Sequence, residues 1–143
     1  MNLAFFSCVF MMRKNDKYFE NLEDLSGISK NHPILSFAFM LILFSLAGIP
    51  PLAGFFAKFY IFKAVIEQSM YFLAIVGLLS TVIAAFYYLR IIKIIYFDPQ
   101  KEKYDTDHHL GLKVSLFIST IFILFYFIYP SALNEIVLKI NII

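Results

Sequence analysis

The fold is decided by Phe44–Tyr60, FSLAGIPPLAGFFAKFY, where a long apolar run is interrupted and then meets a lysine, Lys58. The interrupting residues are small or lack a backbone N–H group, namely Gly48, Pro50, Pro51 and Gly54. Two adjacent prolines remove two hydrogen-bond donors and clash with the preceding turn, so a helix that reaches Ile49 must stop or bend. We therefore predict a discontinuous helix over residues 33–66, broken at Gly48–Pro51.

The composition of the chain places this helix in a membrane. Of the 143 residues, 61% are hydrophobic and 15% are charged, and the mean hydropathy is +0.78. Soluble domains are only about 45–50% apolar and carry about 25% charged residues. The net charge of +2 is too small to indicate nucleic-acid binding, so we expect membrane lipids and membrane proteins as partners. The predicted fold class is an all-α membrane protein.

Apolar and polar segments alternate along the chain. Residues 1–12 are shorter than the roughly 20 helical residues that a span needs, so we expect part of a transmembrane helix there, whose other half is absent from this sequence. Residues 33–66 are too many for one straight span, because about 34 residues rise about 50 Å and the hydrocarbon core is about 30 Å thick. The other segments are predicted as a loop at 13–32, a transmembrane helix at 70–89, a loop at 90–113, a transmembrane helix and its exit at 114–134, and a tail at 135–143. The prediction is thus three complete transmembrane helices plus a half span.

Positive charge indicates the orientation of these spans. Lysine and arginine residues concentrate in the loops 13–32 and 90–113. By the positive-inside rule both loops face the cytoplasm or the mitochondrial matrix, and both termini face the opposite side.

Lys58 is the strongest candidate for chemistry. It follows the break within two turns, and irregular backbone at membrane depth is tolerated only where it faces protein or a water-filled cavity. Loss of hydration there disfavours the charged form of an amine, which allows proton exchange near neutral pH. The alternative is a lysine that extends from the end of a helix to the membrane interface.

Four other charged residues indicate anchoring at the membrane surface. Lys63 and Glu67 are four residues apart and can pair on one helical face. Arg90 and Lys93 suit a membrane interface, where they contact lipid headgroups or neighbouring subunits.

No metal or nucleotide site is expected on this chain. His108 and His109 lie in a polar loop, and adjacent histidines project in different directions, which argues against a metal site. Cys8 is the one cysteine and has apolar neighbours, so we expect a buried thiol. The sequence contains none of the motifs GxGxxG, P-loop, CxxC or HExxH, so neither a nucleotide nor an iron–sulfur cluster is predicted.

Two runs of sequence resemble a known family. FSLAGIPPLAGFFAKFYIFKAVIE, followed by AAFYYLRIIKIIYFD, closely resembles the carboxy-terminal part of subunit 2 of respiratory complex I (NADH:ubiquinone oxidoreductase), the antiporter-like subunit called the N subunit in bacteria. The resemblance implies an antiporter-like helix bundle with inverted repeats, in which Lys58 takes part in proton translocation. It also implies that FMN, the iron–sulfur clusters and quinone belong to other subunits, and that the chain performs no redox chemistry itself. Its implied partners are the other membrane-arm subunits and a chain that supplies the missing amino-terminal helices.

Two other functions fit the same residues. One is a subunit of a multisubunit cation/proton antiporter, and the other is a structural subunit of a membrane complex that no longer pumps protons. A sequence rich in Phe, Ile, Tyr and Lys and without Trp indicates an AT-rich genome. We therefore expect a mitochondrial inner membrane, with both termini in the intermembrane space, and a bacterial plasma membrane as the alternative.

Overall fold

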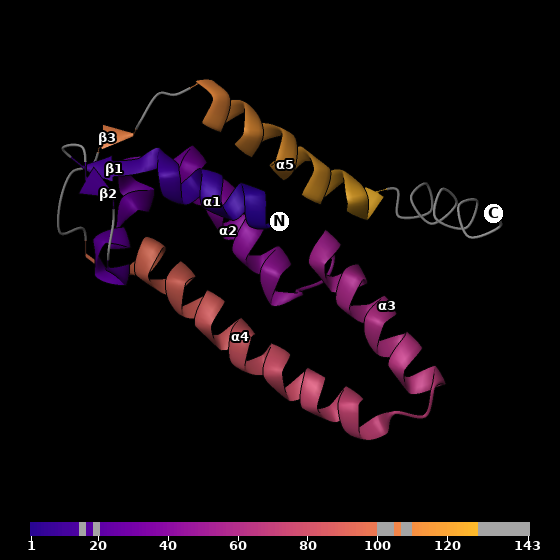
Figure 1. The fold of residues 1–143 in the computed structure, drawn as a ribbon. Helices are drawn as coiled ribbons and strands as arrows, with labels where there is room; N and C mark the ends of the chain where they lie inside the picture. The colour runs from indigo at the N-terminus through magenta and orange to yellow at the C-terminus, as the bar shows by residue number, and fades with distance from the viewer. Residues whose placement is uncertain (15–16, 19–20, 100–104, 107–109, 129–143) are drawn as a thin grey trace.

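The computed structural model describes residues 1–14, 17–18, 21–99, 105–106 and 110–128. Its α-helices in this part of the chain are α1 (Asn2–Met11), α2 (Pro33–Ala47), α3 (Ala53–Glu67), α4 (Tyr71–Phe97) and α5 (Leu110–Ile128). Helix α1 packs against α5, and α2 packs against α4 (Figure 1). Helices α3 and α4 form a hairpin that extends away from the other helices (Figure 1). The helices agree with the predicted all-α membrane fold.

A small antiparallel sheet, which the sequence did not predict, joins the loops predicted at 13–32 and 90–113. Its strands are β1 (Met12–Lys14), β2 (Lys17–Tyr18) and β3 (Asp105–Thr106), in the order β2-β1-β3. Arg13 lies opposite Tyr18 on one side and Asp105 on the other. Strands of two or three residues carry too little alternation to be recognised in a sequence. The sheet brings both lysine-rich loops to one end of the molecule (Figure 1).

Helix α4 is longer than its predicted range of 70–89. It continues from Arg90 to Phe97, so two further turns of helix occupy residues that were predicted to belong to the loop 90–113. These turns bury a set of isoleucines, Ile91, Ile92, Ile94 and Ile95. The helix ends where Pro99 follows, because a proline pushes the preceding residue out of the helical region, and Asp98 is extended.

Helix α5 also begins earlier than predicted, at Leu110 rather than at residue 114. It is described to Ile128, so the predicted exit at 129–134 and tail at 135–143 lie outside the described residues. By length and composition, α4 is long and apolar enough to cross a membrane, while α1, α2 and Leu110–Tyr126 of α5 are shorter apolar helices.

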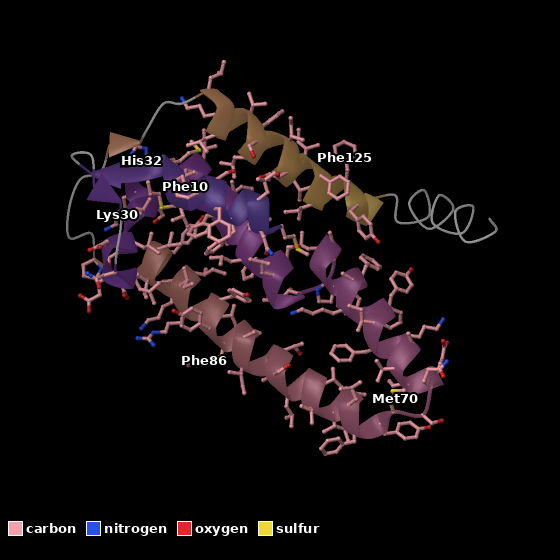
Figure 2. The ribbon with its side chains drawn as sticks, viewed as in Figure 1. Phe10, Lys30, His32, Met70, Phe86 and Phe125 are labelled. Atoms are coloured by element: carbon pink, nitrogen blue, oxygen red, sulfur yellow. The ribbon has the colours of Figure 1, made fainter. Side chains whose placement is uncertain are left out.

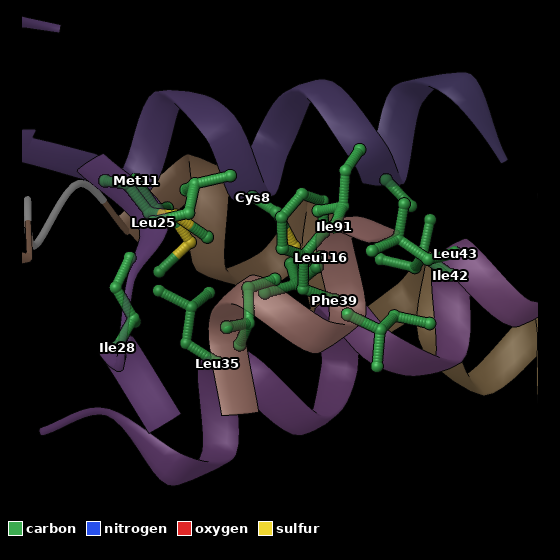
Figure 3. Packing of buried hydrophobic residues seen from close by; sticks show 14 of the residues in the cluster. Cys8, Met11, Leu25, Ile28, Leu35, Phe39, Ile42, Leu43, Ile91 and Leu116 are labelled. Atoms are coloured by element: carbon green, nitrogen blue, oxygen red, sulfur yellow. The ribbon is translucent and has the colours of Figure 1, made fainter. Parts of the chain in front are cut away.

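The buried core lies where α1, α2, α5 and the last turns of α4 meet (Figure 3). Its largest fully buried side chains include Phe39, Ile42 and Leu43 on α2, Ile95 on α4 and Ile123 on α5. Helix α3 stands apart from this core, and Gly54 is its buried residue. The first turns of α4 expose most of their apolar side chains. In the described part of the chain, the hairpin of α3 and α4 therefore offers broad apolar faces to lipid or to other protein.

Candidate functional site at the helix break

The end of α2 is shaped by Gly48. This residue has φ +85°, in the left-handed region that glycine occupies without a steric penalty. Its N–H group donates to the carbonyls of Phe44 and Ser45, and the N–H of Ile49 also donates to Phe44. The last four carbonyls of a helix lack partners within it, and this turn satisfies two of them. The carbonyls of Leu46 and Ala47 remain.

Lys58 binds the two remaining carbonyls. Its Nζ lies 2.9 Å from the Leu46 oxygen and 3.0 Å from the Ala47 oxygen. The side chain therefore turns back from α3 across the break to the end of α2. The carboxyl end of a helix carries partial negative charge, which stabilises an ammonium group there. An ammonium has three N–H bonds, so one remains for water or another acceptor.

Ser45 makes the opposite connection, from α2 to the start of α3. Its Oγ accepts a hydrogen bond of 3.1 Å from the backbone N–H of Gly54, and both residues are buried. Each half of the broken helix is thus held by a side chain of the other half, Lys58 on the end of α2 and Ser45 on the start of α3. We call these two contacts the reciprocal caps.

Gly54 has a different role from the one predicted for it. It was expected to help break the helix, but α3 begins at Ala53 and Gly54 is its second residue. A Cβ atom at this position would overlap the Ser45 carbonyl oxygen and lie 2.6 Å from the Ser45 carbonyl carbon. Gly54 is required for the close approach of the two halves, while residues 48–52 form the break itself.

Gly48 is also packed against the lysine that it faces. A Cβ on Gly48 would lie 2.9 Å from Cδ and 3.2 Å from Nζ of Lys58. The absence of a side chain at this position leaves room for the lysine to reach the end of α2. Lys58 itself is half-buried.

A cleft of about 490 Å³ opens beside Lys58 between α3 and α4. Its walls are mainly aromatic and aliphatic, with contributions from Phe55, Phe59, Phe62, Ile66, Leu78 and Thr81. The cleft also reaches Lys63 and Glu67, whose charged groups lie 3.8 Å apart. This distance confirms the predicted ion pair. The side chains of Lys63 and Glu67 are 58% and 62% exposed, respectively. The amine of Lys58, the cleft and the surface ion pair thus lie along one groove.

Cys8 is a free, fully buried thiol. His108 and His109 lie outside the described residues. Within the described ranges, no group of three or more His, Cys, Asp or Glu residues is placed to hold a metal ion.

Sequence reasoning identified Lys58 but missed Ser45. A serine inside an apolar helix is unremarkable by itself. The available signal was the presence of small residues on both sides of the break, Ser45 before it and Gly54 after it.

These features define a helical membrane protein with a lysine bound across a broken helix. The chain belongs to the NADH:quinone oxidoreductase/Mrp antiporter transmembrane family, whose sequence pattern matches residues 1–84.

The chain is similar to bacterial proteins named NADH-quinone oxidoreductase subunit N. NADH-quinone oxidoreductase subunit N of Pelagibacter ubique is 76% identical over 143 residues, which is all of this chain and 30% of that protein. Subunit N of Parvibaculum lavamentivorans is 47% identical over 133 residues, 93% of this chain and 28% of that protein. The chain therefore spans less than a third of the length of these relatives.

The fold is also similar to a solved structure. A chain of respiratory complex I from Thermus thermophilus, determined with bound aureothin, matches with a TM-score of 0.66 and 25% sequence identity, over 77% of this chain and 26% of that one. The similarity supports the antiporter-like architecture that the sequence resemblance implied.

Proposed function

We propose that this chain forms the carboxy-terminal part of the antiporter-like subunit, called N or 2, of a proton-translocating NADH:quinone oxidoreductase, and that Lys58 carries protons in it. The observation that supports the role of Lys58 most directly is its position across the helix break, half-buried and beside a cleft. NADH oxidation, FMN, the iron–sulfur clusters and quinone belong to other subunits in this proposal, and the chain contributes proton transfer.

The geometry suits a group that gains and loses a proton. A neutral amine keeps two N–H bonds, so Lys58 can still donate to both carbonyls at the end of α2 after it has released a proton. The reciprocal caps can therefore persist in both protonation states. The proton that is exchanged is the one that the two carbonyls do not bind, and the adjoining cleft provides space for the water that accepts it.

The test compares Lys58→Met with Lys63→Met in the complete assembly. Met is unbranched and only one atom shorter than Lys, but its side chain cannot carry a proton. A proton-transfer group at a fixed site contributes a factor of about 10² or more, so Lys58→Met should reduce NADH-driven proton uptake into vesicles by at least about tenfold. Lys63→Met should leave uptake close to that of the wild type, because Lys63 is exposed.

Assembly must be measured in parallel, by the amount of the variant chain that co-purifies with the other subunits. Normal assembly and normal proton uptake in Lys58→Met would refute the proposed role and favour the structural subunit. Loss of assembly without a coupling defect in the remaining complex would also count against it.

An antiporter subunit is the second candidate, because the matching family includes the Mrp antiporters. Proton transport that depends on sodium and not on NADH and quinone would identify this function. Subunit N relatives favour the oxidoreductase.

The location and the missing helices are part of the same proposal. The bacterial relatives favour a plasma membrane over the mitochondrial inner membrane that composition suggested. We infer that the helices corresponding to the rest of subunit N come from further sequence of the same polypeptide or from a separate chain. The intact mass of the chain in the native assembly distinguishes these two sources.

A further inference from the structure

A second polar site lies at the far end of α4, away from Lys58. Here a short 3₁₀ helix, Leu22–Leu25, and the turn after it pack against α4, and the N–H of Gly27 donates to the Ile94 carbonyl at 3.2 Å. An open hollow of about 310 Å³ lies beside this contact. Its lining comprises Glu23, Ser26, Arg90, Lys93, Ile94, Asp98 and Pro99. We propose that this hollow binds the headgroup of a zwitterionic phospholipid, with the phosphate at Arg90 and Lys93 and the amine at Asp98.

The position of the hollow along α4 matches the level of lipid headgroups. At 1.5 Å per residue, Arg90 lies about 28 Å and Lys93 about 33 Å from Tyr71, the first residue of the helix. The hydrocarbon core is about 30 Å thick. With Tyr71 at one interface, both basic residues therefore lie at the other, where phosphate groups are found.

The two basic residues have the arrangement that a phosphate needs. They are three residues apart on one helix, so their side chains start about 5–6 Å apart on one face. Both are exposed, and in the described part of the chain no ion pair joins either to a carboxylate. Arginine and lysine are the usual ligands of phosphate oxygens in proteins.

An exposed apolar stripe leads from Arg90 toward the middle of the membrane. Leu79, Ile83 and Phe86 precede it at spacings that keep them on the same helical face, and their exposed fractions are 61%, 73% and 70%. Figure 2 shows Phe86 on the outward side of α4. A lipid whose phosphate lies at Arg90 would place its acyl chains along this stripe.

The charge of the hollow selects the class of lipid. Its lining places the carboxylate of Asp98 beside the basic pair Arg90 and Lys93. A purely anionic headgroup would bring negative charge next to Asp98, whereas phosphatidylethanolamine offers a phosphate to the basic pair and an amine to the carboxylate. Lipid binding in this hollow is independent of proton transfer at Lys58.

The experiment uses the full-length chain in its native assembly, stripped of lipid in detergent. An equimolar mixture of phosphatidylethanolamine and phosphatidylglycerol is added, and bound lipid is counted by native mass spectrometry. The wild type should prefer phosphatidylethanolamine. Replacing Arg90 and Lys93 by Gln together should lower its binding about 25-fold, since each basic residue near a lipid surface contributes about fivefold, or about 1 kcal/mol.

A single variant tests the role of the Asp98 carboxylate, and a second serves as its control. Asp98→Asn should remove the preference for phosphatidylethanolamine while retaining phosphatidylglycerol, because the basic pair is intact. Lys63→Gln is the matched control, an exposed basic residue on α3 away from the hollow, and it should change neither lipid.

A photoactivatable phosphatidylethanolamine, with a diazirine near its headgroup, tests the same site in the wild-type assembly without any substitution. Labelling should occur in the peptide that contains residues 90–98. Unchanged binding in the Arg90 and Lys93 double variant, a preference for phosphatidylglycerol, or labelling confined to other peptides would each overturn the proposal. Crosslinking of residues 90–98 to another protein subunit, with no lipid labelled there, would show that protein covers the site and would overturn it as well.

Discussion

Replacement of Gly54 by Ala tests the close approach of α2 and α3. The added Cβ would lie 2.6 Å from the Ser45 carbonyl carbon, about 0.8 Å short of the 3.4 Å at which ordinary contact begins. Because the obstruction is backbone, α3 must move away from α2. A shift of this size would also break the 3.1 Å hydrogen bond from the Gly54 N–H to Ser45.

The expected cost follows from these two losses. Overpacking in a tight contact costs about 1–3 kcal/mol, and loss of one buried hydrogen bond costs about 1 kcal/mol. We therefore expect Gly54→Ala to lower the free energy of unfolding of the full chain by about 2–4 kcal/mol. The measurement is a denaturant titration of the purified chain in detergent, followed by helical circular dichroism.

Gly111→Ala is a matched control for this variant. Gly111 is also the second residue of a helix, and a Cβ there would meet nothing within 4 Å. Both variants gain the same helix propensity, about 0.5–1 kcal/mol relative to glycine, so the difference between them reports the contact with Ser45. Equal stability of the two variants would show that a Cβ at position 54 does not collide with the Ser45 carbonyl.

Three further outcomes are expected. Gly48→Ala should lower the free energy of unfolding by about 1–2 kcal/mol, because alanine is strained at the positive φ of this position. It should also slow NADH-driven proton uptake into vesicles, because the added Cβ would displace Lys58. Ser45→Ala should destabilise the chain by about 1 kcal/mol, because it removes the hydrogen bond with the Gly54 N–H. Ser36→Ala should be neutral or stabilising, because the buried Ser36 hydroxyl has no hydrogen-bond partner among the described residues. The same denaturant titration measures both variants. Cys8 is fully buried, so a maleimide should label it only after the chain is unfolded, and rapid labelling of the folded protein would contradict this packing.

The helix break could be predicted because its cause is local. Pro50 and Pro51 cannot continue a helix whatever surrounds them, and the apolar run around them is long enough to reveal the consequence. The side of the break to which Lys58 turns could not be predicted, because it depends on which backbone carbonyls lie within reach in three dimensions. The same limit applies to Ser45, whose partner is nine residues away across the break.

The end of α4 shows a second limit. Arg90 and Lys93 predict the start of a loop, because charged residues usually end an apolar span. The isoleucines between and after them are buried where the last turns of α4 meet α2 and the segment before it, and a local sequence pattern does not reveal that contact. Tertiary packing therefore extended the helix beyond the point that hydropathy indicated.

The partner of Lys58 has a consequence for mutational surveys of this family. The groups that bind its amine belong to the main chain of residues 46 and 47, not to any side chain. Substitution of Leu46 or Ala47 by another apolar residue leaves these oxygen atoms in place, so a scan that seeks an acidic counterpart will pass over them. Apart from replacing Lys58 or adding a side chain at Gly48, disturbing this partnership requires a change in the path of the backbone, for example a proline or a residue inserted between Ala47 and Ala53.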